Sequence, residues 1–498
     1  MGLWVLAVFA CGDDTTTGAD SAPPSETGTP PTDSTPDTGT PTDSVPPTDS
    51  VPETDTDSGT DTHDTDPPPA CDPSTATVAA TGNPDLVTEL ALAVGLDPAC
   101  TPALSCTAAA GTTLDERHEP TLEPTSTEVL LQGLLASTTY SCALRYDEAP
   151  DAELAFSVTT DALPARLSGL TFTVSTWDSA ATDPAFVLLN VFPFDETQDG
   201  QYLVIVDREG AVRWYLDLDG VDGQIGFEWV ADHARFAVAG GLHDRMDPQV
   251  LTLSADAETT LSADAHHDVK WVDDALYVLA GSESEWCIDE HVIATGKTRT
   301  SLCHDDGSGL TTSGLNSLVV RDESAGRKLY VTSQGPAEVV RLDATTGTVD
   351  WRFGATGDFT GPTDSEFPDQ LHDLRLVDCA GYDACLLYYD NGVEDRQSSG
   401  VKVGLHEGSG TATILRTWTE TGWYSAALGG IEELNSGDWL IGQASMYTGS
   451  ENGAGVVQVA GDGTVTWRMA LGPVPWTLYR VRYLDGCAVF DHRGYCSE

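Results

Sequence analysis

Alternating apolar and polar positions dominate the longest part of the chain and predict strands. Between residues 163 and 498, short apolar runs are separated by turns of Gly, Asp and Asn, and helical periodicity is nearly absent. One phrase, an apolar run, a turn with Asp and Gly, and then Val-x-Trp, occurs at residues 204–215, 339–354 and 456–472. This repetition of hairpins predicts an all-β domain, and we expect its tryptophans to pack inside it, namely Trp214, Trp351 and Trp467.

The repeat indicates a β-propeller, in which similar blades surround a central channel. At roughly 50 to 60 residues per blade, the length of residues 163–498 suits about six blades. The predicted fold class is therefore all-β, a six-bladed β-propeller that follows a smaller N-terminal region.

A second β domain is predicted over residues 71–162, where runs such as TEVLLQGL and STTYSCALRYD alternate apolar and polar residues. The order of Leu131-x-Gly133-Leu134, then Thr138-Thr139-Tyr140, then AFSVTTDALP resembles a fibronectin type III domain. The resemblance implies a β-sandwich in which Tyr140 packs at a strand corner. Residues 12–70 are rich in Thr, Asp, Pro and Ser with almost no apolar content, so we expect a disordered linker there.

Residues 1–11, MGLWVLAVFAC, resemble a bacterial lipoprotein signal, with cleavage before Cys11 and a lipid on its sulfur. No Lys or Arg precedes the apolar run, which departs from that pattern, and an ordinary signal peptide or a short buried segment is the alternative. No later stretch approaches the ~20 apolar residues of a membrane span. We therefore expect an exported protein of a Gram-negative bacterium, attached to the outer membrane only through its N-terminal lipid.

Charge and cysteine content narrow the class of partner and the compartment. The formal net charge is −56, from 79 acidic and 23 basic residues, which repels phosphate backbones and argues against a nucleic-acid partner. Setting Cys11 aside leaves ten cysteines, an even number that indicates disulfides in an exported chain. Four pairs lie close in the sequence and two cysteines remain: Cys100 and Cys106, Cys287 and Cys303, Cys379 and Cys385, Cys487 and Cys496, with Cys71 and Cys142 left over. The pairing stays open, and because no CxxC spacing occurs we expect no metal site.

Candidate functional residues lie where polar positions precede strand-like runs, because the first strands of propeller blades surround the channel. Four such places occur: His266-His267-Asp268 before VKWVDD, Asn316-Ser317 before LVV, His372-Asp373 before LRLVD, and Gly429-Gly430-Ile431-Glu432 before ELNSG. A ring of blades would bring these places together around one axis, although they are far apart in the chain.

The order of HHDVKWVDDALYVLAG, then LNSLVVRDESAGRKLYVTSQGPAEVVRLDATTGTVDWRFG, then FPDQLHDLR with YYDNG resembles the arylsulfotransferase family over about residues 165–480. The resemblance implies a six-bladed propeller that moves a sulfuryl group from a phenolic sulfate donor to a phenol acceptor without a cofactor. It implies that His372 is the sulfated nucleophile, since a neutral imidazole can attack sulfur. His266 or His267 matches the first histidine of the channel, where a second histidine can protonate the leaving phenolate, and Asn316 is retained.

Two positions depart from the family pattern, with Gly314 in place of His and Gln334 in place of Arg. Losing one preorganised charge-stabilising donor typically costs ~3 kcal/mol of transition-state stabilisation. Basic residues that are candidates to compensate are Arg375, Lys270 and Arg327. The alternative function is therefore a propeller without turnover that binds a ligand or protein partner, and a purely structural surface protein is a third interpretation.

The same residues also have ordinary structural interpretations. His372 with Asp373 is a pair that can stabilise the start of a strand through hydrogen bonds, and His266 with His267 can be a surface loop pair. Arg375 lies two residues beyond Asp373, on the same side of a strand, which allows an ion pair between them.

Overall fold

The computed structural model describes residues 71–490 except for these segments: 109–116, 179, 181–184, 194–199, 219, 222–223, 242–245, 283–284, 304–313, 334–336, 363–366, 445–452, 474–475 and 486–488. The chain divides into two units, Met1–Pro69 and Ala70–Glu498, and the first lies wholly outside the described residues. The predictions for the signal and lipidation at Cys11, the linker 12–70, Gln334, Cys487 and Cys496 also fall outside them.

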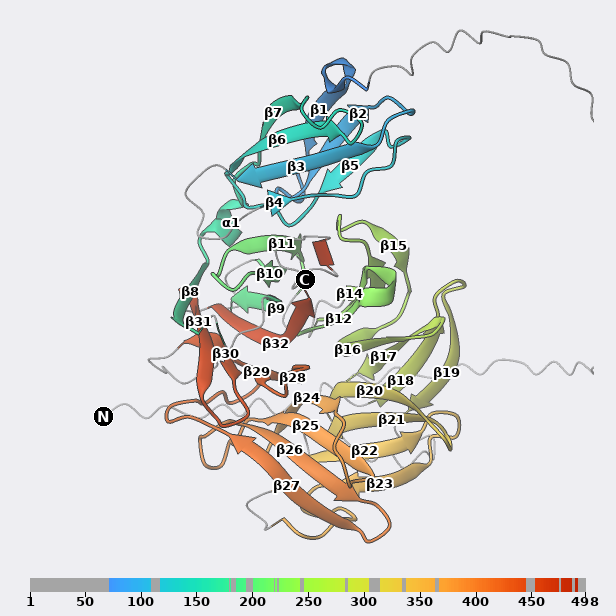
Figure 1. Ribbon diagram of the computed structural model, residues 1–498. Helices are drawn as coiled ribbons and strands as arrows, with labels where there is room; N and C mark the ends of the chain where they lie inside the picture. Colours follow the sequence, from blue (N-terminus) through green and yellow to red (C-terminus); the bar gives the residue numbers. More distant parts are fainter. Residues whose placement is uncertain are drawn as a thin grey trace, which may run out of the picture. The chain divides into compact units, whose positions relative to one another are not determined.

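The described residues form an all-β structure of eight antiparallel sheets (Figure 1). Their helices are short: η1 (Pro73–Thr75), α1 (Ala165–Ser168) and η2 (Ala231–His233). Within the same ranges, no helix has the length and apolar character needed to cross a membrane. The near absence of helical periodicity in the sequence is thus matched by the structure.

Residues 71–162 supply two of the sheets. One holds β1 (Thr77–Gly82), β2 (Leu90–Gly95) and β5 (Glu128–Leu131), and the other holds β3 (Pro102–Ala108), β4 (Arg117–His118), β6 (Thr139–Tyr146) and β7 (Leu154–Thr159). Every second residue of β6 is buried, as its alternating sequence predicts, and one hydrophobic core contains side chains from both sheets. Tyr140 is buried in this core, and its hydroxyl accepts a hydrogen bond from the Leu135 N–H at 2.8 Å.

The remaining six sheets begin with β8 (Thr171–Trp177) and end with β32. Written from one edge strand to the other, the first three are β32 (Trp476–Asp485), β9 (Ala185–Pro193), β10 (Tyr202–Val206), β11 (Val212–Asp217); β12 (Ile225–Val230), β13 (Arg235–Gly240), β14 (Met246–Leu251), β15 (Ala257–Thr260); and β16 (Ala265–Val272), β17 (Ala275–Ser282), β18 (Glu285–Val292), β19 (Lys297–Cys303). The next three are β20 (Leu315–Glu323), β21 (Gly326–Ser333), β22 (Glu338–Asp343), β23 (Val349–Phe353); β24 (Leu371–Leu376), β25 (Ala384–Asp390), β26 (Ser399–His406), β27 (Thr411–Trp418); and β28 (Gly430–Glu433), β29 (Trp439–Gln443), β30 (Ala454–Val459), β31 (Val465–Gly472), to which β8 adds a fifth strand.

The first-named strands of these six sheets contact one another in a closed ring, in the order β12, β16, β20, β24, β28, β32 and back to β12. We call them the inner strands. The ring is completed by segments from opposite ends of the chain, because β32 pairs with β9 and β31 pairs with β8. This propeller-like arrangement leaves the hydrogen-bonding edges of the inner strands facing one another instead of solvent.

The repeated sequence phrase forms equivalent hairpins in three sheets. Residues 204–215, 339–354 and 456–472 cover most of the third and fourth strands of their sheets, paired as β10 with β11, β22 with β23 and β30 with β31. The predicted packing of Trp214, Trp351 and Trp467 is confirmed, since their exposed fractions are 1%, 5% and 0%. Every residue of β10 is buried, which explains its continuous apolar run, YLVIV.

Two glycines permit close approach of neighbouring inner strands. A Cβ atom on Gly226 of β12 would lie 2.5 Å from the Cα of Asp268 on β16. A Cβ atom on Gly430 of β28 would lie 2.8 Å from the Cα of Arg480 on β32. Backbone atoms cannot move aside as a flexible side chain can, so both positions require glycine.

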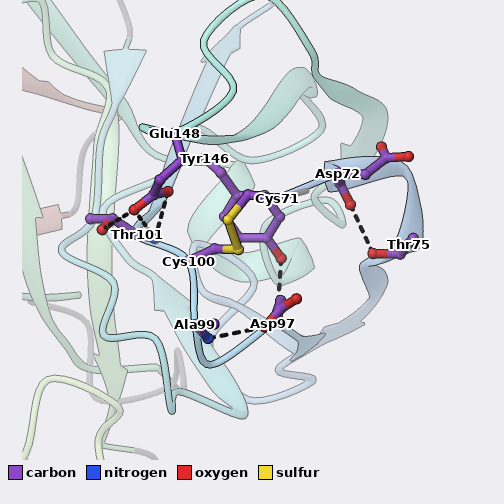
Figure 2. The surroundings of a disulfide bond; sticks show 9 residues. All are labelled: Cys71, Asp72, Thr75, Asp97, Ala99, Cys100, Thr101, Tyr146 and Glu148. Carbon is purple, nitrogen blue, oxygen red and sulfur yellow. Dashed lines mark hydrogen bonds between the residues drawn. A yellow bond between two sulfur atoms is a disulfide. The ribbon is translucent and has the colours of Figure 1, made fainter. Parts of the chain in front are cut away.

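Four disulfides are present among the described residues: Cys71–Cys100, Cys106–Cys142, Cys287–Cys303 and Cys379–Cys385. The sequence left the pairing open; Cys287–Cys303 and Cys379–Cys385 join cysteines that lie close in the chain, whereas the neighbours Cys100 and Cys106 are not joined. The ladder explains the difference, because Cys106 of β3 lies directly opposite Cys142 of β6. The other bond joins Cys71 to Cys100 beside the loop in which Asp97 N–H donates to the hydroxyl of Tyr146 (Figure 2).

Candidate active site

Four of the inner strands, β16, β20, β24 and β32, carry a bulge, and in three of them the bulge contains a non-glycine residue in the left-handed conformation. The left-handed residues are His267 in β16, Asp373 in β24 and Arg480 in β32, with φ of 59°, 50° and 60°, and the ladder register shifts at each place. Such a conformation costs a non-glycine residue ~1–3 kcal/mol, and bulges redirect the adjacent side chains. The residue before each left-handed residue carries a polar ring: His266, His372 and Tyr479.

The side chain of His372 is held from both ring nitrogens. Its Nδ1 lies 2.6 Å from Oδ1 of Asn391, and its Nε2 accepts a hydrogen bond of 3.3 Å from the Leu428 N–H. The amide nitrogen of Asn391 donates to the carbonyl oxygens of Ser425 and Leu428, both at 2.9 Å. Because this orientation turns the Asn391 oxygen toward the imidazole, His372 carries its proton on Nδ1 and its lone pair on Nε2.

The imidazole of His372 is neutral over the physiological range. Burial lowers its pKa to about 4, and the positive charge of Arg480 acts in the same direction, against the opposing effects of Asn391 and Asp373. Only 2% of the residue is exposed. The ring of Tyr479 meets that of His372 edge to face, with 6.4 Å between the centroids.

His266 and His267 form a pair at the start of β16. Their Nδ1 atoms are 2.9 Å apart, so one of the two nitrogens carries a proton and the other accepts it. His266 is buried, and its ring packs edge to face on Trp286 with 4.3 Å between centroids. The interpretation of the pair as a surface loop is therefore wrong for His266. In the ring of inner strands, β20 separates this pair from His372 on β24.

Asn316 joins three inner strands. Its amide nitrogen donates to the Leu371 carbonyl at 2.8 Å, and its amide oxygen accepts from the Thr332 hydroxyl at 2.6 Å. Its carbonyl oxygen accepts from the Tyr479 hydroxyl at 3.2 Å and from Nη2 of Arg480 at 2.6 Å. These contacts tie β20 to β24 and β32, so Asn316 positions the residues on either side of it.

Gly314 is the position at which the sequence resemblance would have a histidine. Gly314 precedes β20 with a φ of 74°, in the left-handed region that a histidine would adopt only with strain. The position therefore supplies no imidazole to the site, and the backbone there is built for glycine.

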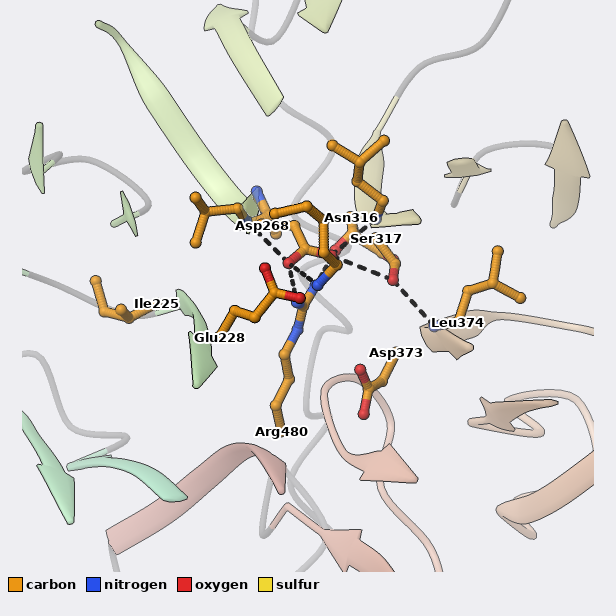
Figure 3. A network of polar contacts seen from close by, with 12 residues as sticks. Ile225, Glu228, Asp268, Asn316, Ser317, Asp373, Leu374 and Arg480 are labelled. Carbon is orange, nitrogen blue, oxygen red and sulfur yellow. Dashed lines mark hydrogen bonds and ion pairs between the residues drawn. The ribbon is translucent and has the colours of Figure 1, made fainter. Parts of the chain in front are cut away.

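Asp268 is the centre of a buried polar network on the ring axis (Figure 3). Its carboxylate forms an ion pair with Nη1 of Arg480, lies 3.0 Å from Nζ of Lys270 and accepts the Leu318 N–H at 2.8 Å. Burial acts to raise the pKa of Asp268, but the charges of Arg480 and Lys270 outweigh it and hold the pKa at about 2. The carboxylate is thus ionised and already paired, which leaves it no role as a proton donor.

A second buried ion pair lies beside the first. Nη1 and Nη2 of Arg482 donate to Oδ2 and Oδ1 of Asp373 at 2.7 and 2.5 Å, and the Ile431 N–H donates to Oδ2 at 2.9 Å. The ion pair expected between Asp373 and Arg375 is present, but it is long, with Nε 3.7 Å from Oδ1. The main partner of Asp373 is therefore Arg482, which sequence reasoning did not identify.

The sequence contained a signal for these two arginines. Arg480 and Arg482 interrupt the apolar strand WTLYRVRYLD at alternate positions, a pattern that places charge on one face of a buried strand. They reach Asp268 and Asp373 only because β32 closes the ring between β28 and β12.

Two further acids on inner strands have raised pKa values. Burial raises the pKa of Glu432 to about 8, aided by the charge of Asp373 and opposed by the Tyr483 N–H and Lys270. Burial also raises the pKa of Glu228, against Lys270 and the Trp271 N–H, which donates to it at 2.6 Å. Glu432 therefore holds its proton to a higher pH than an exposed glutamate does.

Metal-ligating side chains gather in one place among the described residues, at Cys71, Cys100 and Glu148. The two sulfurs there are joined in a disulfide, so they are not thiolate ligands. The candidate active site is instead the set His266, His267, Asn316, His372 and Tyr479.

Comparisons with known proteins assign neither a family nor a function to this chain. No family model matches the chain, and no curated protein matches it. Similar solved structures include a protein of unknown function from Bacteroides caccae (11% identity, 61% of this chain and 99% of that chain, TM-score 0.41), TolB from Acinetobacter baumannii (13%, 71% and 81%, 0.40) and a subtype N11 neuraminidase-like protein of A/flat-faced bat/Peru (9%, 62% and 93%, 0.31). At these identities and TM-scores, no function is transferred to this chain.

Proposed function

We propose that this chain is a six-bladed β-propeller that transfers a sulfuryl group from an aryl sulfate to a phenol through His372. The observation that carries the proposal is the contact between Nδ1 of His372 and Oδ1 of Asn391, at 2.6 Å. It fixes the proton on Nδ1 and leaves the lone pair on Nε2, which is the form of histidine that attacks an electrophile. The depressed pKa keeps this form populated at neutral pH.

The reaction has two balanced steps. In the first, Nε2 forms a bond to sulfur while the bond from sulfur to the phenolic oxygen breaks, and the phenolate takes a proton from a histidine of the His266–His267 pair. In the second, a phenol attacks the sulfur, the N–S bond breaks, and the same histidine pair accepts the phenol's proton. The donor and acceptor are both small phenolic molecules, and the reaction needs no cofactor.

The charge that develops on the sulfuryl oxygens calls for a cation, and Arg480 is a cation whose charge acts on His372. Its charge already acts on the pKa of His372, and it donates to the Asn316 carbonyl at 2.6 Å. Arg480 is paired with Asp268 as well, so its stabilising effect is weaker than that of an unpaired arginine. Slow turnover is the consequence we expect.

Substrate must displace the segment that covers His372. Nε2 receives the Leu428 N–H, and Leu428 itself holds a φ of 66°, next to Gly429 at 99°. Opening of this segment at Leu428 would release the lone pair of Nε2 and break the hydrogen bond from Asn391 to the Leu428 carbonyl, while the bond from Asn391 to the Ser425 carbonyl can remain.

This cover also favours a second function, a propeller that binds a ligand or protein partner without turnover. If the Leu428 N–H stays hydrogen-bonded to Nε2, that nitrogen cannot contact a sulfate ester, and His372 and Asn391 act only to stabilise the start of β24. The position of Gly314, which supplies no imidazole, points the same way.

The test is to incubate the full chain with 4-nitrophenyl sulfate and no acceptor, and to map the added SO₃ by peptide mass spectrometry. A sulfuryl group on the His372 peptide, absent from His372→Ala, is the expected result. Release of nitrophenol by His372→Ala at the wild-type rate would overturn the proposal. An unmodified wild-type peptide, with no nitrophenol released after a phenol is added, supports the binding propeller.

For the N-terminal part, we propose a fibronectin type III-like sandwich over residues 71–162. The hydrogen bond from Leu135 to the buried Tyr140 hydroxyl, a few residues along the chain, is the corner contact that such sandwiches use. The four disulfides fit an exported chain. A lipid on Cys11, anchoring the protein at an outer membrane, remains our prediction for the part of the chain outside the described residues.

A further inference from the structure

The guanidinium of Arg375 presents a buried edge with two unused donors. Its Nε and Nη2 atoms are buried, and within the described ranges neither has a hydrogen-bond acceptor. These two atoms lie on the same side of a guanidinium, so together they form the edge that binds a carboxylate or sulfate through two parallel hydrogen bonds. Leaving two buried donors unsatisfied costs ~1–3 kcal/mol each.

The nearby carboxylate of Asp373 does not fill this role. Its Oδ1 lies 3.7 Å from Nε of Arg375, beyond hydrogen-bond distance. Both of its oxygens are bonded to Arg482, and one also receives the Ile431 N–H. Asp373 is therefore a neutralised neighbour of Arg375.

Basic residues outnumber aspartates around the axis, which leaves a positive excess wherever the neighbouring glutamates are protonated. Asp268 pairs with Arg480 and Asp373 with Arg482, so these four residues cancel. Lys270 and Arg375 remain. The charge of Lys270 acts on both Glu228 and Glu432, whose pKa values are raised by burial. An anion bound at this end of the inner strands would balance the excess.

Arg375 is separate from the nitrogen that we propose reacts. In the ladder, His372 lies opposite Tyr389 and Arg375 lies opposite Leu387, which places the two about 7 Å apart along the strand. The bulge at Asp373 also directs the side chains of β24 differently on its two sides.

We propose that Arg375 anchors a second site, which binds a small oxyanion, a carboxylate or sulfate group, through Nε–H and Nη2–H. The site goes beyond the sulfuryl transfer assigned to His372 and does not depend on it. The bound oxyanion accepts two parallel hydrogen bonds from this edge of the guanidinium, which Asp373 does not reach. The positive charge of Lys270 adds long-range attraction for the anion.

Isothermal titration of the full chain with sodium sulfate and with sodium acetate, at constant ionic strength, tests the site. The wild type is expected to bind at least one of these oxyanions, and Arg375→Gln is expected to bind it at least tenfold more weakly. Comparing the two titrations shows whether the site prefers a sulfate or a carboxylate. Sodium chloride is the control for a general positive field, since a spherical ion gains nothing from two parallel donors.

Three variants make the result specific. Arg299→Gln is the matched control, because Arg299 lies on the outermost strand β19 and pairs with Asp274 at the surface. This variant should bind the oxyanion with the same affinity as the wild type. Arg375→Lys keeps the positive charge but lacks the two parallel N–H donors of the guanidinium, so it should bind the oxyanion at least threefold more weakly than the wild type. His372→Ala should bind as the wild type does, which separates this site from the proposed reaction. The proposal is overturned if the wild type binds neither oxyanion, if chloride binds equally well, or if Arg375→Gln, shown folded by circular dichroism, binds like the wild type.

Discussion

Asn391 and His372 are 19 residues apart in the sequence, yet Oδ1 of Asn391 lies 2.6 Å from Nδ1 of His372. Asn391 follows β25 directly and His372 lies in β24, so the hairpin between these strands brings the two side chains together. The amide of Asn391 is in turn fixed by carbonyl oxygens of the segment that precedes β28. The contact therefore connects a sheet, its neighbour and the proposed nucleophile.

Asn391→Ala should destabilise the protein and release the tautomer of His372. The change leaves the Nδ1–H of His372 and the Leu428 carbonyl without this partner and removes one of two donors to the Ser425 carbonyl, which we expect to cost about 3 kcal/mol of unfolding free energy. Urea unfolding measures this loss, and the ¹⁵N chemical shifts of the imidazole report the tautomer. Asn435→Ala, at an exposed turn, is the control and should change stability by less than ~0.5 kcal/mol. Equal stabilities of the two variants would contradict the role of Asn391.

His372 should make the protein less stable as the pH falls. Its pKa is about 4 in the folded protein against an ordinary value of 6.5, so between these values the unfolded chain binds a proton that the folded protein does not. The contribution to stability is fully present above pH 6.5 and is lost as the pH falls toward 4, at ~1.4 kcal/mol per pH unit. His372→Gln should reduce the stability difference between pH 7 and pH 4.5 by about 2 to 3 kcal/mol.

The measurement for this prediction is urea unfolding of both proteins at the two pH values. The same substitution at His406, which stacks on Tyr382 at the end of β26, is the control. If His372→Gln shows the pH dependence of the wild type, the folded protein protonates His372 normally and the prediction is wrong.

Asp268→Asn should be strongly destabilising, because it leaves Arg480 buried and without its counter-charge. Breaking one side of a buried ion pair typically costs ~3–5 kcal/mol. The double variant Asp268→Asn with Arg480→Gln should lose less than the sum of the single losses, since the guanidinium that lost its counter-charge is removed as well. Lys270, the other partner of Asp268, loses its counter-charge equally in both variants that carry Asp268→Asn. Thermal unfolding of the three variants gives the coupling energy, and strict additivity would argue against the pair.

A surface pair provides the comparison for that cycle. Arg145 and Glu153 are 2.5 Å apart, but about half of each side chain is exposed, at 54% and 45%. Glu153→Gln should therefore change the unfolding free energy by less than ~1 kcal/mol.

Peptide mapping without reduction should find Cys106 joined to Cys142 and Cys71 joined to Cys100. Replacing Cys106 and Cys142 with Ser should cost about 2–4 kcal/mol, because their bond closes a separation of 36 residues in the unfolded chain. Replacing Cys379 and Cys385 removes a bond across a separation of 6 residues and should cost less. A disulfide-linked fragment that joins Cys100 to Cys106 would contradict the pairing of β3 with β6 that places Cys106 opposite Cys142.

Local patterns were sufficient for the elements of this fold. The phrase with Val-x-Trp predicted the hairpins and the burial of Trp214, Trp351 and Trp467, because alternation and turn residues act over a few neighbouring positions. The polar starts of four strands were found in the same way, and they begin β16, β20, β24 and β28. The tautomer of His372 could not be predicted from such patterns, because it depends on how the side chain of Asn391 is held.

The amino-acid sequence by itself determined the all-β class, the positions of the repeated hairpins and the polar residues that begin the inner strands, since each depends on side-chain alternation within a short segment. Only the tertiary structure decided that Arg480 and Arg482 neutralise Asp268 and Asp373, and that Cys106 bonds to Cys142. The reason is that these contacts cross between segments far apart in the chain. They form only when β32 closes the ring and when β3 finds its register with β6.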